Sequence, residues 1–379
     1  MFRKRIFIKI VCGNAICIRN GELLIMNMLF ESLPVLNSIV QSEPGFIMQP
    51  LGTFFGFIID MIMRGITFIF TPVNALGFSI IVITLIVRGA LIPQQIKMQR
   101  NSAKTRAIKP EMDKIREKYG NTRDPELRRK MAAEVQALNQ KHGINMIASC
   151  LPLLVTMPIF IALFGVFGRA FHFIPSINEV YTGLANEIIA LPGYVRSEVF
   201  ENIVLSVIPD ALRGDFSGPT AGGFLATSSH DWNRVIHVLT TEHWEGIFAN
   251  LRAYFPEHLS GVYAAYNAKL DIEVFFGLNL VTISGWALPG IIIPILSAGT
   301  MAFQSWQMSR LNPATDQQQK IMQYMMMLVM PLLFGWFTVN ASSAVGLYWV
   351  MGNVFLITQN FIVYKFFPHK IGLADAPAK

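Results

Sequence analysis

The stretch SIIVITLIVRGALIPQQIK, residues 79–97, decides which class of protein this chain forms. Thirteen uncharged residues, 75–87, precede Arg88, and five mostly apolar residues follow it. That length and composition are typical of a helix that crosses a bilayer. An arginine inside such a helix, however, costs about 3 kcal/mol on insertion scales. The segment is therefore a membrane span only if something compensates for Arg88.

The rest of the chain has the composition of a polytopic membrane protein. Of its 379 residues, 53% are hydrophobic and 15% are charged, whereas a soluble domain carries about 25% charged residues. Five apolar segments approach or exceed the roughly 20 residues that a helical span requires. These five predicted spans cover residues 74–94, 146–168, 286–306, 321–339 and 343–365.

A sixth apolar segment, residues 51–72, contains two charged residues of opposite sign. Asp60 and Arg64 are four residues apart, so they share one face of a helix and can pair. Such a pair fits an amphipathic helix that lies in the membrane interface. The alternative is a sixth true span, which would place the N-terminus on the opposite side of the membrane.

The first 50 residues do not define a clear element. A basic start precedes a short apolar stretch, but polar residues interrupt that stretch too soon for a typical signal peptide. Translation from Met26 or Met28 is an alternative start. Three cysteines give no disulfide framework and are interpreted as structurally incidental.

The charges of the loops predict the orientation. Residues 95–145 contain thirteen Lys and Arg against six Asp and Glu, a net charge of +7, whereas residues 170–285 contain five against twelve, a net charge of −7. The positive-inside rule then predicts that the first segment is cytoplasmic and the second extracellular. The loop near 307–320 and the tail 369–379 fall on the cytoplasmic side, and the N-terminus is predicted to be extracellular. We expect a multi-pass protein of the bacterial plasma membrane.

Residues 95–145 are predicted to form a basic helical hairpin. Apolar residues recur at helical spacing over 108–119 and again over 127–138, and turn signals separate the two stretches. Antiparallel packing through these stripes would leave the basic faces exposed. Those faces serve either solvation and topology alone, or docking on lipid headgroups, ribosomal RNA or an acidic protein. The residues assigned to such docking are Arg106, Lys109, Lys114, Arg116, Arg128 and Arg129.

Residues 170–285 are too polar to be embedded throughout, and their helical patterns predict a small, mostly helical extracellular subdomain. The whole chain contains no GxxxxGK[ST] loop, GxSxG elbow or HExxH arrangement, and no predicted span contains a histidine. We therefore expect no enzyme, no cofactor and no metal site. The net charge of +7 follows from topology, so we expect no DNA partner.

The polar residues within the predicted spans are the candidates for function. Arg88 is the most informative, because no Asp or Glu occurs in any of the five predicted spans to pair with it. Either its side chain snorkels to the cytoplasmic interface, about 9 Å away by helical rise, or it faces a water-filled recess between helices. For Gln304 and Asn353 the simpler interpretation is hydrogen bonding between helices, and for Trp349 it is core packing.

Several stretches resemble one known family. Arg88 comes late in the first predicted span and leads into the basic hairpin. After it follow GINMIASCLPLLVTMPIFIALFGVF at 143–167, FFGLNL at 275–280 and LYWVMGNVFLITQ at 347–359. In this order they resemble the YidC/Oxa family of membrane protein insertases, in the five-span form of Gram-positive bacteria, over roughly residues 50–368. The resemblance implies an all-α polytopic membrane protein with five transmembrane helices, a cytoplasmic helical hairpin and an extracellular helical insertion.

The resemblance also implies a mechanism. Members of the family have a hydrophilic groove in the inner leaflet, in which a cation transiently attracts the acidic segment of a nascent protein while its apolar helix enters the lipid. No nucleotide is hydrolysed. By this resemblance Arg88 is the groove cation, Gln304 a polar wall and Trp349 a lining aromatic residue. The other groove positions are Thr156, Tyr348 and Asn353.

The implied partners are nascent membrane proteins, the Sec translocon, membrane lipids, and the ribosome and signal recognition particle pathway. Thr156 stands where many members have Gln, which puts one polar groove contact in doubt. The long basic tail that some members use to bind the ribosome is missing, which puts direct ribosome docking in doubt. An anion-binding channel or secondary transporter, and a non-catalytic assembly scaffold, are the rival hypotheses.

Overall fold

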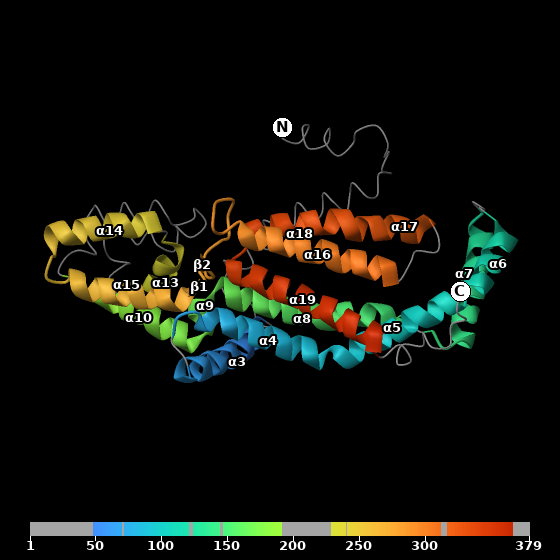
Figure 1. Ribbon diagram of the computed structural model, residues 1–379, viewed down its shortest axis with the longest axis horizontal. Helices are drawn as coiled ribbons and strands as arrows, with labels where there is room; N and C mark the ends of the chain where they lie inside the picture. Colours follow the sequence, from blue (N-terminus) through green and yellow to red (C-terminus); the bar gives the residue numbers. More distant parts are fainter. Residues whose placement is uncertain are drawn as a thin grey trace, which may run out of the picture. The chain divides into compact units, whose positions relative to one another are not determined.

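The structure is a computed structural model, and it describes residues 48–69, 72–120, 124–144, 147–191, 229–239, 241–311 and 317–366. The described residues are almost all helical, as expected for an all-α polytopic membrane protein (Figure 1). The predictions for the start at Met26 or Met28 and for the tail 369–379 lie outside the described residues.

Three described helices are long and apolar enough to cross a membrane. They are Gln49–Ile69, Lys320–Val339 and Ser343–Phe366. The bent pair Ala75–Ala90 and Ile92–Ala107 makes a fourth if it counts as one span. Thr156–Gly168, within the second predicted span, is a shorter apolar helix. These helices are consistent with a multi-pass membrane protein, while the count of five spans stays a prediction.

The apolar helices pack into one bundle. Its members are α3 (Met48–Ile69), α4 (Ala75–Ala90), α8 (Ile147–Gly168), α16 (Ile292–Leu311), α18 (Met330–Val339) and α19 (Ser343–Phe366). α19 contacts α4, α8 and α16, and α16 also contacts α18 (Figure 1). Gly346 of α19 allows one of these close approaches, since a Cβ atom there would clash with Ile293 of α16. α17 (Gln317–Tyr324) and the π-helical turn η2 (Met325–Val329) lead into α18.

The first predicted span, residues 74–94, is broken. α4 ends at Ala90, and α5 (Ile92–Ala107) continues at an angle of 50° to it. Pro93 lies in the first turn of α5. Proline has no N–H to donate and its ring clashes with the carbonyl four residues earlier, so a straight helix through this point is disfavoured. The break leaves Arg88 in the last turn of α4.

The third predicted span, residues 286–306, also differs from its helix. α16 begins only at Ile292, and residues 286–291 form bends and turns. Pro289 cannot donate a backbone hydrogen bond, and a Cβ atom on Gly290 would clash with the carbonyl of Ser284. Hydropathy detects the apolar composition of this segment, but it cannot tell a helix from an apolar loop.

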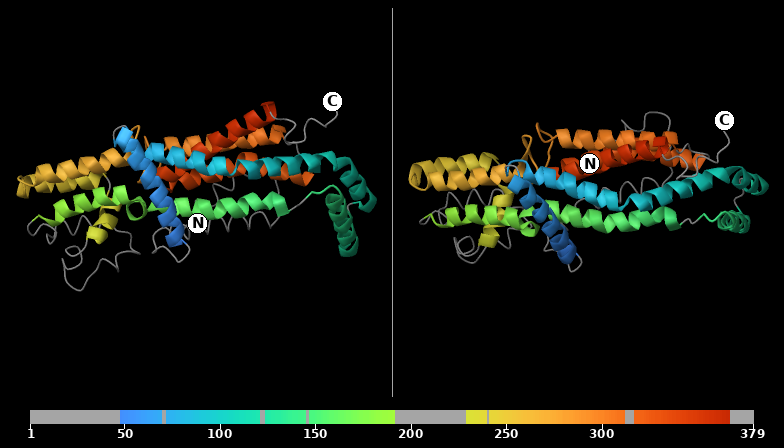
Figure 2. Two further views of the ribbon diagram at one scale, coloured as in Figure 1. Left: turned by 90° about the horizontal axis from the view of Figure 1, so that it is seen from below. Right: turned by 60° about the horizontal axis from the view of Figure 1, so that its bottom comes forward.

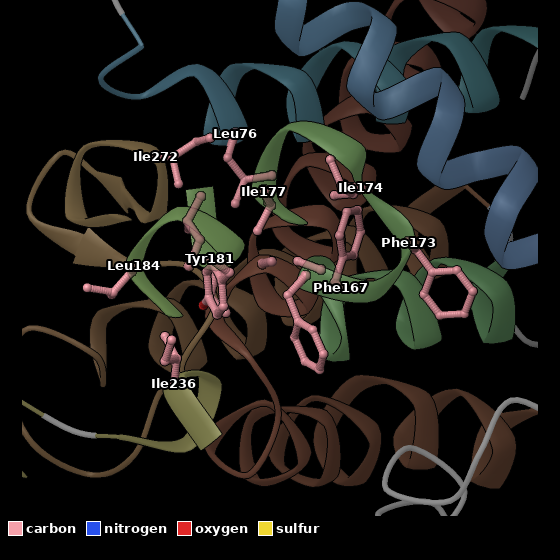
Figure 3. Packing of buried hydrophobic residues seen from close by; sticks show 14 of the residues in the cluster. Leu76, Phe167, Phe173, Ile174, Ile177, Tyr181, Leu184, Ile236 and Ile272 are labelled. Carbon is pink, nitrogen blue, oxygen red and sulfur yellow. The ribbon is translucent and has the colours of Figure 1, made fainter. Parts of the chain in front are cut away.

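We call the described residues of the segment after α8, 170–191, 229–239 and 241–285, the insertion subdomain. Its described elements are α9 (Ala170–Phe173), α10 (Pro175–Ile189), α13 (Ser229–Val238), α14 (Thr241–Tyr254), α15 (Leu259–Glu273), β1 (Val274–Phe275) and β2 (Leu278–Asn279). α10 contacts α13 and α15. The buried core is shared with the bundle, because Leu76 of α4 and Phe167 of α8 belong to the same cluster as Tyr181 and Ile236 (Figure 3).

α3 crosses α4 and α8 obliquely and is tied to the insertion subdomain (Figure 2). Arg64 pairs with Asp60 at 2.8 Å, as the spacing predicted, and also with Glu179 of α10 at 2.8 Å. The Asp60 carboxylate accepts the backbone N–H of Ser176 at 2.7 Å. The N-cap residue of α10, Ile174, has no side chain that can accept this bond, so Asp60 caps α10 from another helix.

The basic segment contains two packed helices, α6 (Lys109–Tyr119) and α7 (Pro125–Lys141). Ile108 and Leu138 are buried between them, and Met112 and Ile115 pack against this small core. Asp124 caps α7 by accepting the N–H of Glu126 at 2.9 Å. The predicted apolar stripes therefore meet, as in a helical hairpin.

Candidate functional site

Arg88 lies on α4 with its guanidinium against the backbone of α19. A Cβ atom at Gly352 would be 2.7 Å from Nη2 and 3.1 Å from Nε of Arg88, so only glycine leaves this space. The Nε atom is buried and has no hydrogen-bond partner among the residues that the structure describes. None of the ion pairs among the described residues includes Arg88. A buried guanidinium nitrogen without a partner costs free energy, which makes Arg88 the leading functional candidate.

α19 carries three of the other predicted site residues on different faces. Tyr348 is buried one helical turn before Gly352, and its ring lies 6.3 Å from that of Phe167 on α8. Asn353 points toward α16, where its Nδ2 donates to Thr300 Oγ1 at 3.2 Å. Gly352 and Tyr348 therefore lie on one side of α19, and the amide of Asn353 faces α16.

Trp349 joins α8, α18 and α19 through its indole ring. The ring stacks on Phe334 at 4.2 Å between centroids and meets Phe160 edge-on at 5.4 Å. These contacts agree with core packing. The indole Nε1, however, is buried with no acceptor among the described residues. One N–H donor is therefore left over inside the bundle.

Gln304 on α16 and Thr156 on α8 are both half-buried. Within the described part of the chain, no hydrogen bond joins either side chain to Arg88. The structure therefore brings Arg88 together with the Tyr348–Gly352 face of α19.

Sequence reasoning missed a polar chain that links α5, α19 and α16. Gln99 Nε2 donates to Asn360 Oδ1 at 3.0 Å, and Asn360 Nδ2 donates to Gln307 Oε1 at 3.1 Å. Gln307 Nε2 then donates to the carbonyl of Ile357 at 3.1 Å. Asn353 and Asn360 are two helical turns apart on α19, and this seven-residue spacing is the signal that could have revealed the chain.

Several buried polar atoms in this region lack a partner among the described residues. Buried polar groups are normally hydrogen-bonded to protein or to ordered water. Besides Arg88 and Trp349, the atoms of α5, α16 and α19 without a partner among the described residues are Gln94 Nε2, Gln99 Oε1, Arg106 Nη2, Ser297 Oγ, Ser305 Oγ, both amide atoms of Gln359, and Tyr364 Oη. Water molecules are the natural partners for such a set.

The six basic residues predicted to dock a partner have three different surroundings. Arg106 lies in α5, before the hairpin, and its Nη1 donates to the carbonyl of Leu311 at the C-terminal end of α16. This differs from the prediction of an exposed basic face, because the last carbonyls of a helix lack partners and attract cations. Lys109 and Arg116 flank Asp113 at 3.9 Å and 3.7 Å. The three that are exposed are Lys114, Arg128 and Arg129.

A second buried polar cluster lies in the insertion subdomain. The Glu273 carboxylate is fully buried and accepts hydrogen bonds from Lys269 at 2.8 Å, from Asn279 at 2.9 Å and from the hydroxyl of Tyr181. Burial lowers the pKa of nearby His237 to about 4, so this imidazole is neutral at pH 7. Within the described residues, no three His, Cys, Asp or Glu side chains are grouped to hold a metal ion.

Comparisons with known proteins identify the family of the chain. The family described as "60Kd inner membrane protein" matches residues 25–197 and 235–370. Membrane protein insertase MisCA of Bacillus subtilis is 26% identical over 287 residues, which cover 76% of this chain and 69% of that protein. Membrane protein insertase YidC 1 of Bacillus cereus is 24% identical over 295 residues, covering 78% and 74%.

A third relative matches more strongly over a shorter region. Membrane protein insertase YidC 1 of Halalkalibacterium halodurans is 40% identical over 91 residues, which cover 24% of this chain and 35% of that protein. The family match takes in both the Arg88 helix and α19, the two elements that meet at Gly352. The chain therefore belongs to the 60Kd inner membrane protein family, the YidC/Oxa family of membrane protein insertases.

Proposed function

We propose that this chain inserts nascent membrane proteins through a hydrated recess around Arg88. The observation that carries the proposal is the guanidinium of Arg88, which lies against Gly352 with Nε buried and without a hydrogen-bond partner in the described part of the chain. Because no carboxylate of the described bundle neutralises it, its attraction remains available to an acidic residue of a client. In a low-dielectric bundle this attraction is stronger than in water.

The buried polar atoms along α5, α16 and α19 support the hydrated recess. They lack partners among the described residues, and water would satisfy them. We place Gln304, Thr156 and Asn353 on the walls of this recess and Trp349 at its lipid side, where its indole N–H is left over. Hydration of the recess would also offset the cost of Arg88 within the membrane.

Insertion on this proposal needs no nucleotide. Arg88 draws the acidic, hydrophilic segment of the client partway into the inner leaflet. Burial of the client's apolar helix in lipid contributes about 25 cal/mol per Å², and the membrane potential acts on its acidic residues. Arg88 then releases the client's segment, because only the attraction between opposite charges holds that segment.

The orientation and the partners belong to the same proposal. The basic hairpin is cytoplasmic, and its exposed Lys114, Arg128 and Arg129 receive clients from the ribosome, the signal recognition particle pathway or the Sec translocon, or contact anionic lipid. The insertion subdomain is then extracellular. Because Asp60 in the middle of α3 caps a helix of this subdomain, we place α3 in the outer membrane interface.

The test is insertion into liposomes that contain only the purified full chain. The client is a small membrane protein with an acidic translocated segment, and protease protection measures its insertion. Arg88→Ala should lose most of the protection, whereas Arg88→Lys should retain it because a groove needs only the charge. A matched client whose translocated segment lacks acidic residues should be much less sensitive to Arg88→Ala.

Three outcomes would contradict the proposal. Equal protection with and without the protein would refute the insertase function itself. Loss of insertion in Arg88→Lys as complete as in Arg88→Ala would indicate a bidentate anion site, as in a channel or transporter. Full insertion by Arg88→Ala would leave the family function intact and remove Arg88 from the mechanism.

A further inference from the structure

The segment before α16 is apolar without being helical. Residues 274–309 contain no charged residue, yet α16 begins only at Ile292. The first half of the run is the β1–β2 hairpin and the turns that follow it, and we call residues 274–291 the apolar loop. Four of its large hydrophobic side chains are strongly exposed: Phe276 (73%), Ile283 (63%), Trp286 (68%) and Leu288 (78%). In a loop that faced water, these exposed apolar side chains would contribute no favourable free energy.

The backbone holds one of these side chains outward at a cost. Phe276 has a φ of 47°, a conformation that bulky residues rarely adopt, and Gly277 beside it has a φ of 81°. The N–H of Phe276 donates to the side chain of Asn74 at 2.7 Å, which fixes the hairpin tip to the start of α4. The conformation is thus imposed by its surroundings, and it presents a phenyl ring that finds little cover in the protein.

Hydrogen bonds place the apolar loop at the level where the bundle helices end. The carbonyls of Leu280 and Thr282 accept the N–H groups of Ala344 and Ser343 at the start of α19, at 2.8 Å and 3.0 Å. The N–H of Gly285 donates to Val339 at the end of α18, at 2.9 Å. Arg88 lies about 20 Å along α4 from this level, by helical rise. The loop therefore sits at the end of the bundle opposite to Arg88.

The irregular backbone of the loop is largely satisfied within the protein. The N–H groups of Val281 and Thr282 donate to the Asn279 side chain, and that of Leu280 donates to the Glu273 carbonyl. The N–H of Ser284 donates to Ala341. Non-helical backbone at membrane depth is tolerated only when its polar groups find such partners. The loop, which lies between a polar subdomain and a helix, meets this condition.

The exposed side chains of the loop continue onto an exposed face of α16. Leu288 is followed by Ile292, which is 40% exposed, and by Ile295, which is 63% exposed, at the spacing of one helix face. Apolar side chains on that face of a membrane helix meet lipid. The apolar surface of the loop is thus continuous with the lipid-facing surface of the bundle.

We infer that the apolar loop is immersed in the outer leaflet and anchors the insertion subdomain to the bilayer. Its partner is lipid at the boundary between headgroups and acyl chains, where Trp and other amphipathic side chains are favoured. Phe276, Trp286 and Leu288 are the anchors. This inference rests on the membrane class of the protein and, for the choice of leaflet, on the orientation proposed above; it does not depend on the role of Arg88.

Fluorescence quenching in vesicles tests the immersion. The full chain, with its three cysteines replaced by serine, receives a single cysteine at Trp286 and an environment-sensitive fluorophore. It is reconstituted in phosphatidylcholine and phosphatidylglycerol vesicles. A nitroxide carried near the top of the lipid acyl chain should quench this probe, iodide in water should not, and the emission should shift to the blue. Leu288→Cys gives a second position in case Trp286→Cys folds poorly.

Tyr254→Cys is the matched control. Tyr254 is an aromatic residue of the same subdomain, at the end of α14, and its exposed fraction of 71% is close to that of Trp286. Its neighbours include Arg252 and Glu257, so its probe should be quenched by iodide and not by the lipid nitroxide. Iodide quenching at position 286 equal to that at 254 would overturn the inference. A probe at 286 shielded from both quenchers would also overturn it, because protein rather than lipid would then cover the loop.

Discussion

Replacing Gly352 by alanine should weaken the insertion of acidic clients while leaving the fold at least as stable. The new methyl group would lie 2.7 Å from Nη2 and 3.3 Å from Cζ of Arg88. An ordinary contact is about 3.5 Å or more, so the guanidinium must withdraw by about 1 Å. It can do so cheaply, because it is the end of a flexible side chain. Alanine in a helix interior is also about 0.5–1 kcal/mol more stable than glycine.

The size of the functional effect follows from the displaced charge. In an effective dielectric of about 20, moving a client carboxylate from about 4 to about 5 Å from the guanidinium reduces their attraction by about 1 kcal/mol. Since 1.4 kcal/mol corresponds to about tenfold, the attraction of the client to the recess should fall about fivefold. The net charge of the protein does not change, so any loss reports the position of Arg88.

The assay is protease protection of an acidic client in liposomes, with the melting temperature of each variant measured in parallel. Gly89→Ala is the control, because Gly89 adjoins Arg88 on α4 and a Cβ atom there meets no heavy atom within 4 Å. It should gain the same helical stability and insert clients normally. If Gly352→Ala inserted clients as well as Gly89→Ala did, while Arg88→Ala failed, the position of the guanidinium would be irrelevant and the reasoning wrong.

Further predictions concern stability. Arg106→Gln removes the donor on the last carbonyl of α16 and should cost about 1–2 kcal/mol, whereas exposed Arg128→Gln should cost under about 0.5 kcal/mol; equal melting temperatures would contradict the capping role. Lys269→Met leaves the buried carboxylate of Glu273 without its cation and should cost about 3–5 kcal/mol in thermal unfolding. Acidification from pH 7 to pH 5 should lower stability, because folding lowers the pKa of His237 from 6.5 to about 4 and the unfolded chain binds the proton more tightly. His237→Phe should flatten that pH profile, and an unchanged profile would exclude this histidine as its source.

The local features of the fold could be predicted from sequence because they depend on neighbours along the chain. Four-residue spacing is enough to pair Asp60 with Arg64 on one helix face. Asp124 before Pro125 is enough to start α7. Long apolar runs are enough to indicate a polytopic membrane protein. Because none of the predicted spans contains Asp or Glu, Arg88 stands out as a charge that has no partner of opposite sign in those spans.

Contacts between helices required the tertiary structure. Gln99 and Asn360 are 261 residues apart and Arg106 and Leu311 are 205 apart, and no spacing rule relates positions on different helices. Their meeting depends on how the helices cross and on which glycines allow close approach, as Gly352 does for Arg88.

The segment before α16 illustrates both what the sequence could predict and what it could not. Hydropathy assigned residues 286–291 to a span because it measures the apolar character of each side chain. Only the structure shows that these residues form bends and turns and that α16 begins at Ile292. The sequence by itself indicated a membrane protein with an arginine, Arg88, inside a predicted span and no carboxylate in any of the five predicted spans. The tertiary structure alone decided what surrounds that cation, because packing between distant segments is set by three-dimensional fit rather than by periodicity.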